Sequence, residues 1–364
     1  MPAIVSVSTE MPPYHMTQQE TKELIYHLFS PSTPHVDRLI SVFDHSEIVN
    51  RQFMAPKSWY VEAHTFAEKN ALYVKSAVKL GVNAVKSCIE DAKKHVDVDL
   101  KDVDALICVS SSGISTPTID AKIMNELSFS PHVKRMPLWG LGCAGGAAGL
   151  SRAYDYCKAY PHAKVLVLCI EFCSLTFTRD DRSKSNIVGT SLFGDGVACA
   201  LITGDQMEFH QHTNGTNRPY IKEVQSTFME DSEDIMGWDL QEDGLHVIFS
   251  RDIPNVVEKW LKPNVDGFLK GMSVNVKDIQ AFVAHPGGKK VLTAYEQALN
   301  FSESMTEVPR KILSNHGNMS SPTLLYVLKE FMEKPFNHGD MGLATALGPG
   351  FSSELLLLEW RDIS

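Results

Sequence analysis

The chain has 364 residues, 43% of them hydrophobic, which is enough for one substantial core or for two smaller cores packed together. Its 44 Asp and Glu residues outnumber its 34 Lys and Arg residues, so the formal net charge is −10. Phosphate backbones repel a chain this acidic, which excludes nucleic acid as a predicted partner.

The amino-terminal segment has no basic stretch and only a five-residue apolar run, so no secretion signal is expected. The longest apolar runs, KVLVLCI and ELLLLEW, have the length of strands and are too short to span a bilayer. Seven cysteines occur without a C-x-x-C pair, which indicates reduced thiols rather than a disulfide framework. We therefore expect a cytoplasmic protein with no membrane span.

Helical and strand patterns alternate along the chain. Residues 71–95 repeat apolar side chains at helical spacing, and VDALICVSSSG (103–113) then predicts a buried strand that runs into a turn. KVLVLCIEF (164–172) and GVACALITG (196–204) predict further buried strands, whereas the acidic run 229–243 is expected to be a solvated loop. This alternation favours an α/β protein with a largely buried sheet.

Residues 140–146 read GLGCAGG, which satisfies the G-x-G-x-x-G pattern of a dinucleotide-binding loop but places a cysteine between the glycines. One interpretation is a pyrophosphate loop, with Glu171 at the end of the next strand as the ribose-binding acid. The other is a seat for a nucleophilic thiol. An isolated cysteine is more often a packed apolar side chain, so the surroundings of Cys143 decide between these interpretations.

The second half of the chain repeats the first. KDVDALICV at Lys101 is echoed by KDIQAFVAH at Lys277, and FGDGVACALI at Phe193 by LGPGFSSELL at Leu347. We predict two related halves, residues 1–205 and 206–364, which meet near the polar, turn-rich stretch GDQMEFHQHTNGTNRP.

This repeat places three polar residues at the ends of predicted elements. Cys143 lies 42 residues after Lys101 and Asn318 lies 41 residues after Lys277, and each opens an amphipathic run. Both are therefore expected at the N-termini of related helices, where Asn318 could serve as the N-cap alone or also in catalysis. His285 ends the strand IQAFVAH, and open α/β sheets place their sites at such ends.

A thiol at a helix N-terminus lies near unpaired N–H groups, and these, together with a nearby imidazole, favour the nucleophilic thiolate. The glycines around Cys143 let a bulky electrophile approach and let backbone N–H groups point at an oxyanion. N–H groups of His285 and Asn318 would hold a carbonyl oxygen as negative charge builds on it. A thiol, an imidazole and these N–H donors together suit acyl transfer onto Cys143 and stabilisation of an enolate.

Five motifs, GLGCAGGAAGL, FGDG, AHPGG, GNMSSP and LGPGF, resemble in order and spacing those of type III polyketide synthases, the chalcone synthase-like enzymes. The resemblance implies a thiolase fold of αβαβα layers with two pseudo-symmetric halves, a homodimer, and a catalytic triad of Cys143, His285 and Asn318. It implies acyl-CoA and malonyl-CoA as substrates, with no cofactor and no metal. A starter loads onto Cys143, malonyl-CoA loses carbon dioxide, the resulting enolate extends the chain, and the cycle repeats until the product cyclises.

The same resemblance assigns residues around the triad. Phe177 matches a pocket-gating phenylalanine, and Val247 stands where plant members carry a second one; without the resemblance, both could equally be core residues. The smaller Val247 predicts a wider pocket, a long aliphatic starter and an alkylpyrone product, as in bacterial alkylpyrone synthases of the Bacillus type. The motifs AHPGG and LGPGF supply further expected pocket residues: Gly287, Gly288, Gly348 and Pro349.

Contacts to the coenzyme A phosphates are expected from Arg51, which aligns with a family arginine but could also be a solvated surface charge. His45 and Ala55 stand where plant members carry lysines, so Lys57 is the predicted substitute.

Three alternatives remain. In ketoacyl carrier-protein synthase III the histidine is followed by Gln-Ala-Asn, whereas His285 is followed by Pro-Gly-Gly. A nicotinamide-dinucleotide-binding oxidoreductase leaves His285 and Asn318 unexplained. A non-catalytic binding module predicts that Cys143 is inert.

Overall fold

The computed structural model describes residues 1–30, 36–210, 217–250 and 253–362. Its centre is a nine-stranded mixed sheet in the order β11-β12-β13-β8-β1-β7-β6-β4-β5. The strands of the first part are β1 (Ala3–Glu10), β4 (Ala105–Val109), β5 (Lys134–Leu138), β6 (Lys164–Phe172) and β7 (Asp195–Thr203). Those of the second part are β8 (Asn217–Phe228), β11 (Ile279–Ala284), β12 (Met341–Gly348) and β13 (Ser352–Asp362).

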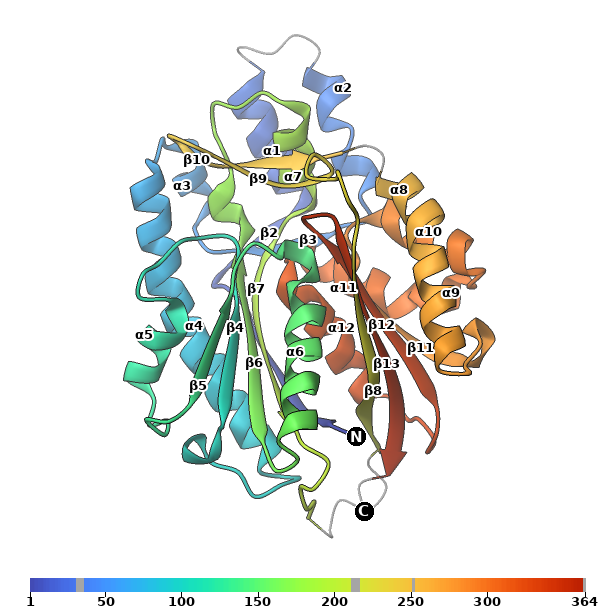
Figure 1. The fold of residues 1–364 in the computed structure, drawn as a ribbon. Helices are drawn as coiled ribbons and strands as arrows, with labels where there is room; N and C mark the ends of the chain where they lie inside the picture. Colours follow the sequence, from blue (N-terminus) through green and yellow to red (C-terminus); the bar gives the residue numbers. More distant parts are fainter. Residues whose placement is uncertain (31–35, 211–216, 251–252, 363–364) are drawn as a thin grey trace.

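The two parts of the sheet meet at one residue pair, Ala3 of β1 opposite Tyr220 of β8. Between them lie α6 (Gly145–Ala159) and α12 (Ser321–Met332), as Figure 1 shows. On the outer faces, α4 (Phe66–Ala92) and α5 (Ile119–Glu126) cover the first part, and α9 (Lys262–Gly271) and α10 (Lys289–Leu299) cover the second. The order of layers is therefore αβαβα, which confirms the predicted fold class.

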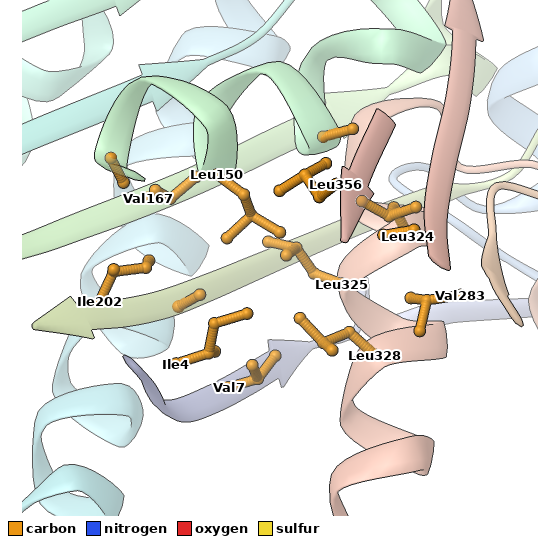
Figure 2. Packing of buried hydrophobic residues seen from close by; sticks show 14 of the residues in the cluster. Ile4, Val7, Leu150, Val167, Ile202, Val283, Leu324, Leu325, Leu328 and Leu356 are labelled. Carbon is orange, nitrogen blue, oxygen red and sulfur yellow. The ribbon is translucent and has the colours of Figure 1, made fainter. Parts of the chain in front are cut away.

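The central core is made by α6 and α12 together with the inner faces of both sheet parts. In Figure 2, Leu150 of α6 lies among Leu324, Leu325 and Leu328 of α12, with strand residues of both sheet parts around them. Full burial of one such aliphatic side chain contributes about 1.5–3 kcal/mol. The two central helices are thus held rigidly, and so are the chain segments at their N-termini.

The repeat predicted from sequence has the same local structure in both halves. A short 3-10 helix precedes each strand, Leu100–Asp102 before β4 and Val276–Asp278 before β11. Each is closed by a capping box, from Asp99 and Asp102 in one half and Asn275 and Asp278 in the other.

Element bounds follow the predictions closely, with two differences. The helix expected over 71–95 is α4, which begins at Phe66 because Thr65 and Glu68 form a capping box, and ends at Ala92. The acidic run 229–243 is not simply a loop, because its second half contains β9 (Met236–Gln241), paired with β10 (Gly244–Phe249) in a hairpin. Met236 and Trp238 lie two residues apart on β9, so their side chains point to the same face of the hairpin.

Smaller elements gather at the end of the sheet where β4, β6 and β11 finish (Figure 1). They are α1 (Gln18–Phe29), α2 (Val36–Ile40), α3 (Lys57–Val61), α7 (Lys184–Leu192), the strand pair β2 (Tyr14–Thr17) and β3 (Asn50–Phe53), and the β9–β10 hairpin. Between β10 and α9 lie α8 (Ile253–Val256) and a π-helical turn (Val257–Leu261), and α11 (Glu307–His316) precedes α12. Among the described residues, no helix combines the length and apolar character needed to cross a membrane.

Candidate active site

Cys143 lies in the 3-10 turn Gly142–Ala144, directly before α6, and its side chain is almost fully buried. Gly142 makes this turn possible because its φ is +46° and an added Cβ would lie 2.9 Å from Pro349 Cδ. Gly146, one turn on, faces the backbone oxygen of Ser321, to which an added Cβ would approach 2.3 Å. The glycines therefore allow α6 to pack closely on α12, which leaves no open groove for a pyrophosphate at Gly146.

Asn318 lies two residues before Ser320, which is the N-cap of α12, so Asn318 is not the N-cap itself. Its Oδ1 accepts a hydrogen bond from the Ser320 backbone N–H at 2.8 Å. This bond fixes the orientation of the amide, so that Nδ2 points away from the Ser320 N–H. Nδ2 donates to the Gly287 carbonyl oxygen at 3.2 Å and lies 3.8 Å from Cys143 Sγ. The structure thus brings Cys143 and Asn318 into direct contact, with Gly287 beside them.

His285 directly follows β11, and its backbone N–H donates to the Thr345 carbonyl oxygen of β12 at 2.8 Å. Its side chain is buried, and neither ring nitrogen has a hydrogen-bond partner among the described residues. A buried polar group without a partner is costly and therefore uncommon in native proteins. Gly287, whose N–H donates to the His285 carbonyl oxygen at 3.1 Å, joins this segment to Asn318.

Burial shifts the pKa of both ionisable groups towards the neutral form. Burial raises the pKa of the Cys143 thiol to about 11, although hydrogen bonds from Ser320 and Asn318 partly oppose the rise. Burial also lowers the pKa of His285 to about 3. This desolvation acts in the opposite direction to the helix N-terminus and a nearby imidazole, which favour the thiolate.

A cavity lined in part by Cys143 is called the Cys143 cavity below. The β9–β10 hairpin forms much of its wall. Its lining residues are Gly142, Cys143, Phe193, Met236, Gly237, Trp238, Val247, Ile248, Phe249, Ser320 and Pro349. Phe193, Met236 and Trp238 were not among the expected site residues, although Phe193 belongs to the FGDG motif.

A second, mainly apolar hollow, called the apolar pocket below, lies between α1, α3 and α7. It is lined by Met16, Thr21, Leu24, Ile25, Phe53, Tyr60, Cys173, Ser174, Thr176, Phe177, Asn186, Gly189, Thr190, Phe193 and Val247. Phe193 and Val247 line both hollows, so they lie where the two adjoin. Phe177 lines only the apolar pocket of these two and stacks on Phe29, with ring centroids 6.4 Å apart.

Gly348 and Gly288, two of the glycines expected in the pocket, lie against different parts of the protein. Gly348 packs against the turn that carries Cys143, where an added Cβ would lie 2.4 Å from the Leu141 carbonyl oxygen. Pro349, the next residue, lines the Cys143 cavity. Gly288 faces Leu192 at ordinary contact distance and lines neither hollow.

Arg51 is completely buried, so the expectation of a coenzyme A phosphate contact does not fit its position. Its guanidinium donates to the carbonyl oxygens of Thr190 and Phe193, at 2.6 and 2.7 Å, and to Gln18 Oε1 at 2.7 Å. Burial lowers the pKa of Arg51 to about 9, and nearby Asp195 partly offsets this. Arg51 therefore braces the end of α7 and the segment that carries Phe193.

Lys57, the other residue expected at the phosphates, is exposed at the first position of α3 and lines neither hollow.

Glu171 is buried behind the site and cannot reach a ribose. Its carboxylate accepts from the Ser111 backbone N–H at 3.0 and 3.1 Å and from the Ser321 hydroxyl at 3.0 Å. Burial raises the pKa of Glu171 to about 7. Together with the filled space at Gly146, this removes the structural basis of the dinucleotide interpretation.

The chain matches the family "Chalcone and stilbene synthases" in both parts, the N-terminal domain over residues 42–206 and the C-terminal domain over residues 221–361. A protein of Bacillus subtilis (strain 168) named "Putative chalcone synthase" is 48% identical over 363 residues, covering 99% of either chain. The 1,3,6,8-tetrahydroxynaphthalene synthase of Streptomyces peucetius subsp. caesius is 32% identical, over 98% of this chain and 93% of its own. The crystal structure of the enzyme of that name from Streptomyces coelicolor A3(2), described as a bacterial type III polyketide synthase, superposes with a TM-score of 0.91 at 25% identity, covering 99% of each chain.

Proposed function

The chain belongs to the chalcone and stilbene synthase family, the type III polyketide synthases, and from this premise we propose which residues carry its reaction and which starter it takes. As a member of this family it is an acyltransferase that performs iterative condensations with malonyl-CoA. Its substrates are coenzyme A thioesters, and the family uses no cofactor. The family assignment takes the place of the three alternatives: a ketoacyl carrier-protein synthase III, a nicotinamide-dinucleotide-binding oxidoreductase and a non-catalytic binding module.

In the proposed first step, the Cys143 sulfur attacks the carbonyl carbon of a starter acyl-CoA. The thiol proton passes to His285, whose ring nitrogens have no partner among the described residues, and then leaves on the coenzyme A sulfur. The products are an acyl thioester on Cys143 and free coenzyme A. Burial favours the neutral thiol and the neutral imidazole, so the proposed proton transfer accompanies the attack on the bound thioester.

In the proposed second step, malonyl-CoA loses carbon dioxide, and its thioester oxygen takes up negative charge as an enolate. The Asn318 Nδ2–H and an N–H of neutral His285 donate to that oxygen. The Ser320 N–H fixes the direction of the Asn318 amide in advance, so no reorganisation is needed. The enolate carbon then attacks the acyl group on Cys143, forming a carbon–carbon bond and releasing the cysteine sulfur.

For the starter, we propose a long aliphatic acyl chain. The observation that carries this proposal is that Phe193 and Val247 line both the Cys143 cavity and the apolar pocket. An acyl group on Cys143 that extended past these two side chains would reach Met16, Leu24 and Ile25, and each methylene buried there would contribute about 0.8 kcal/mol. By the resemblance to bacterial alkylpyrone synthases of the Bacillus type, the product would be an alkylpyrone.

We further propose that the enzyme is a cytoplasmic homodimer in which the half 1–205 supplies the nucleophile and the half 206–364 supplies His285 and Asn318. Two exposed apolar side chains near the Cys143 turn support a partner surface there, Trp139 at 57% and Ile114 at 40% exposure. The Trp139 indole N–H donates to the Gly113 carbonyl oxygen, which holds these two loops together. Light scattering on the wild type and on Trp139→Asp tests this surface.

Acyl-CoAs of graded length and aromatic acyl-CoAs, each incubated with malonyl-CoA and followed by mass spectrometry of the products, test the starter and the product. We expect turnover to rise with aliphatic chain length and the products to have pyrone masses. Turnover confined to aromatic starters would contradict the proposed starter.

A further inference from the structure

Gly189 lies inside α7, a position where the helix itself gives no reason for a glycine. Glycine is a poor helix former, because it loses more backbone freedom on folding than any other residue. The φ of Gly189 lies outside the left-handed region, so its backbone conformation is open to any residue. The reason for the glycine is therefore sought in the space around it.

The space beside Gly189 is occupied by two side chains of the candidate active site. An added Cβ would lie 3.2 Å from Val247 Cγ1 and 3.3 Å from Phe193 Cε2. Both distances are shorter than an ordinary van der Waals contact, so Val247 and Phe193 would have to move to make room. These are the two side chains that line both the Cys143 cavity and the apolar pocket, whereas Gly189 lines the apolar pocket but not the Cys143 cavity.

The backbone at the end of α7 is anchored, which limits how far the helix could retreat from such a contact. Arg51 donates to the Thr190 carbonyl oxygen at 2.6 Å, and the Asn318 backbone N–H donates to the Leu192 carbonyl oxygen at 2.8 Å. A shift of α7 would disturb both bonds, and the second of them belongs to the segment of the proposed catalytic amide. An added side chain at Gly189 would therefore displace the side chains opposite it rather than the helix.

We propose that Gly189 is a specificity-determining residue, whose missing side chain leaves the room that a long aliphatic acyl chain needs beside Phe193 and Val247. This inference rests on the proposed function, since it takes Cys143 as the acyl carrier and the apolar pocket as the place of the chain. A long chain that extends into the apolar pocket packs against α7 at Gly189. An acetyl group on Cys143 stays within the Cys143 cavity and does not meet this position.

The test measures the rate at which acetyl-, octanoyl- and palmitoyl-CoA load Cys143, followed by intact-protein mass spectrometry. In Gly189→Ala the palmitoyl rate should fall by about tenfold, the lower end of what one extra methylene costs in a hydrophobic pocket. The acetyl rate should stay close to that of the wild type. Gly267→Ala is the matched control, because an added Cβ at Gly267 in α9 meets nothing within 4 Å, and it should leave all three rates unchanged.

A second arm removes the atom that the new methyl group would meet. In a Val247→Ala background, Gly189→Ala should lower the palmitoyl rate by about threefold at most, because residues in contact give non-additive effects. Urea unfolding of each variant shows whether it is folded. If Gly189→Ala does not fold, Val247→Ile adds volume on the other side of the same contact and should lower the palmitoyl rate while sparing the acetyl rate.

An unchanged palmitoyl-to-acetyl ratio in folded Gly189→Ala, or in Val247→Ile where that variant replaces it, would overturn the inference and leave the proposed function intact. An equal loss for all three acyl-CoAs that Val247→Ala does not relieve would also overturn it, because Gly189 would then serve helix packing alone. Failure of every acyl-CoA to load Cys143 in the wild type would instead overturn the proposed function.

Discussion

The amide nitrogen of Asn318 lies 3.8 Å from the sulfur of Cys143, although 175 residues separate them in the chain. The contact exists because α6 and α12 pack side by side between the two parts of the sheet, and each residue lies just before one of these helices. The packing of these two helices therefore places the Cys143 sulfur against a hydrogen-bond donor, Asn318 Nδ2.

Replacing Asn318 by Ala should lower the rate of condensation by about 10²–10³-fold, the usual cost of losing one oxyanion donor. Loading of Cys143 by acyl-CoA should fall much less, because the proposed role of Asn318 is to hold the enolate oxygen. Single-turnover loading and decarboxylation of malonyl-CoA, measured separately, check this. Equal losses of rate in loading and in decarboxylation would contradict a role of Asn318 that is confined to the enolate.

Alkylation of Cys143 by iodoacetamide should be slow at neutral pH and rise about tenfold per pH unit up to at least pH 9. Only the thiolate reacts, and burial raises the pKa of this thiol to about 11, so the reactive fraction keeps increasing over this range. Peptide mapping against Cys143→Ala isolates this site from the other six cysteines. A rate that is already level between pH 6 and pH 8 would show a thiolate–imidazolium pair in the resting enzyme.

Val247→Phe should lower kcat/KM for long-chain acyl-CoA by about tenfold, because overpacking at this junction costs on the order of 1–3 kcal/mol. Acetyl-CoA should lose little, since its acyl group does not reach past Val247. Val49→Phe, at a position 56% exposed, is the matched control and should leave both substrates unchanged. A parallel loss for both acyl-CoAs would mean that the junction does not sort acyl chains.

Gly142→Ala should reduce the free energy of unfolding by about 1–2 kcal/mol from the left-handed backbone alone, with more from contact with Pro349. Gly267→Ala is the control, because Gly267 lies in α9 without a positive φ and an added Cβ meets nothing within 4 Å. That control should raise stability by about 0.5–1 kcal/mol. Urea unfolding of the three proteins measures both values, and a neutral Gly142→Ala would show that the turn relaxes without cost.

The strands and helix starts that carry the site could be predicted from the sequence, because the residues that mark them lie close together in the chain. The Lys101 and Lys277 repeats predicted equivalent strands, and the amphipathic runs that follow Cys143 and Asn318 predicted the starts of related helices. The burial of Arg51 could not be predicted, because an arginine in a polar segment gives no sign that Gln18, Thr190 and Phe193 enclose it. The pKa directions at Cys143 and His285 were missed for a similar reason, since desolvation depends on every layer packed around the site.

We expect each acyl chain to be carried on Cys143 during extension. Incubation with a long-chain acyl-CoA, followed by digestion and mass spectrometry, should show the acyl mass on the peptide that contains Cys143. Cys143→Ala should show neither this adduct nor product. An acyl group found on another residue, or a Cys143→Ala enzyme that forms polyketide at the wild-type rate, would contradict this role of Cys143.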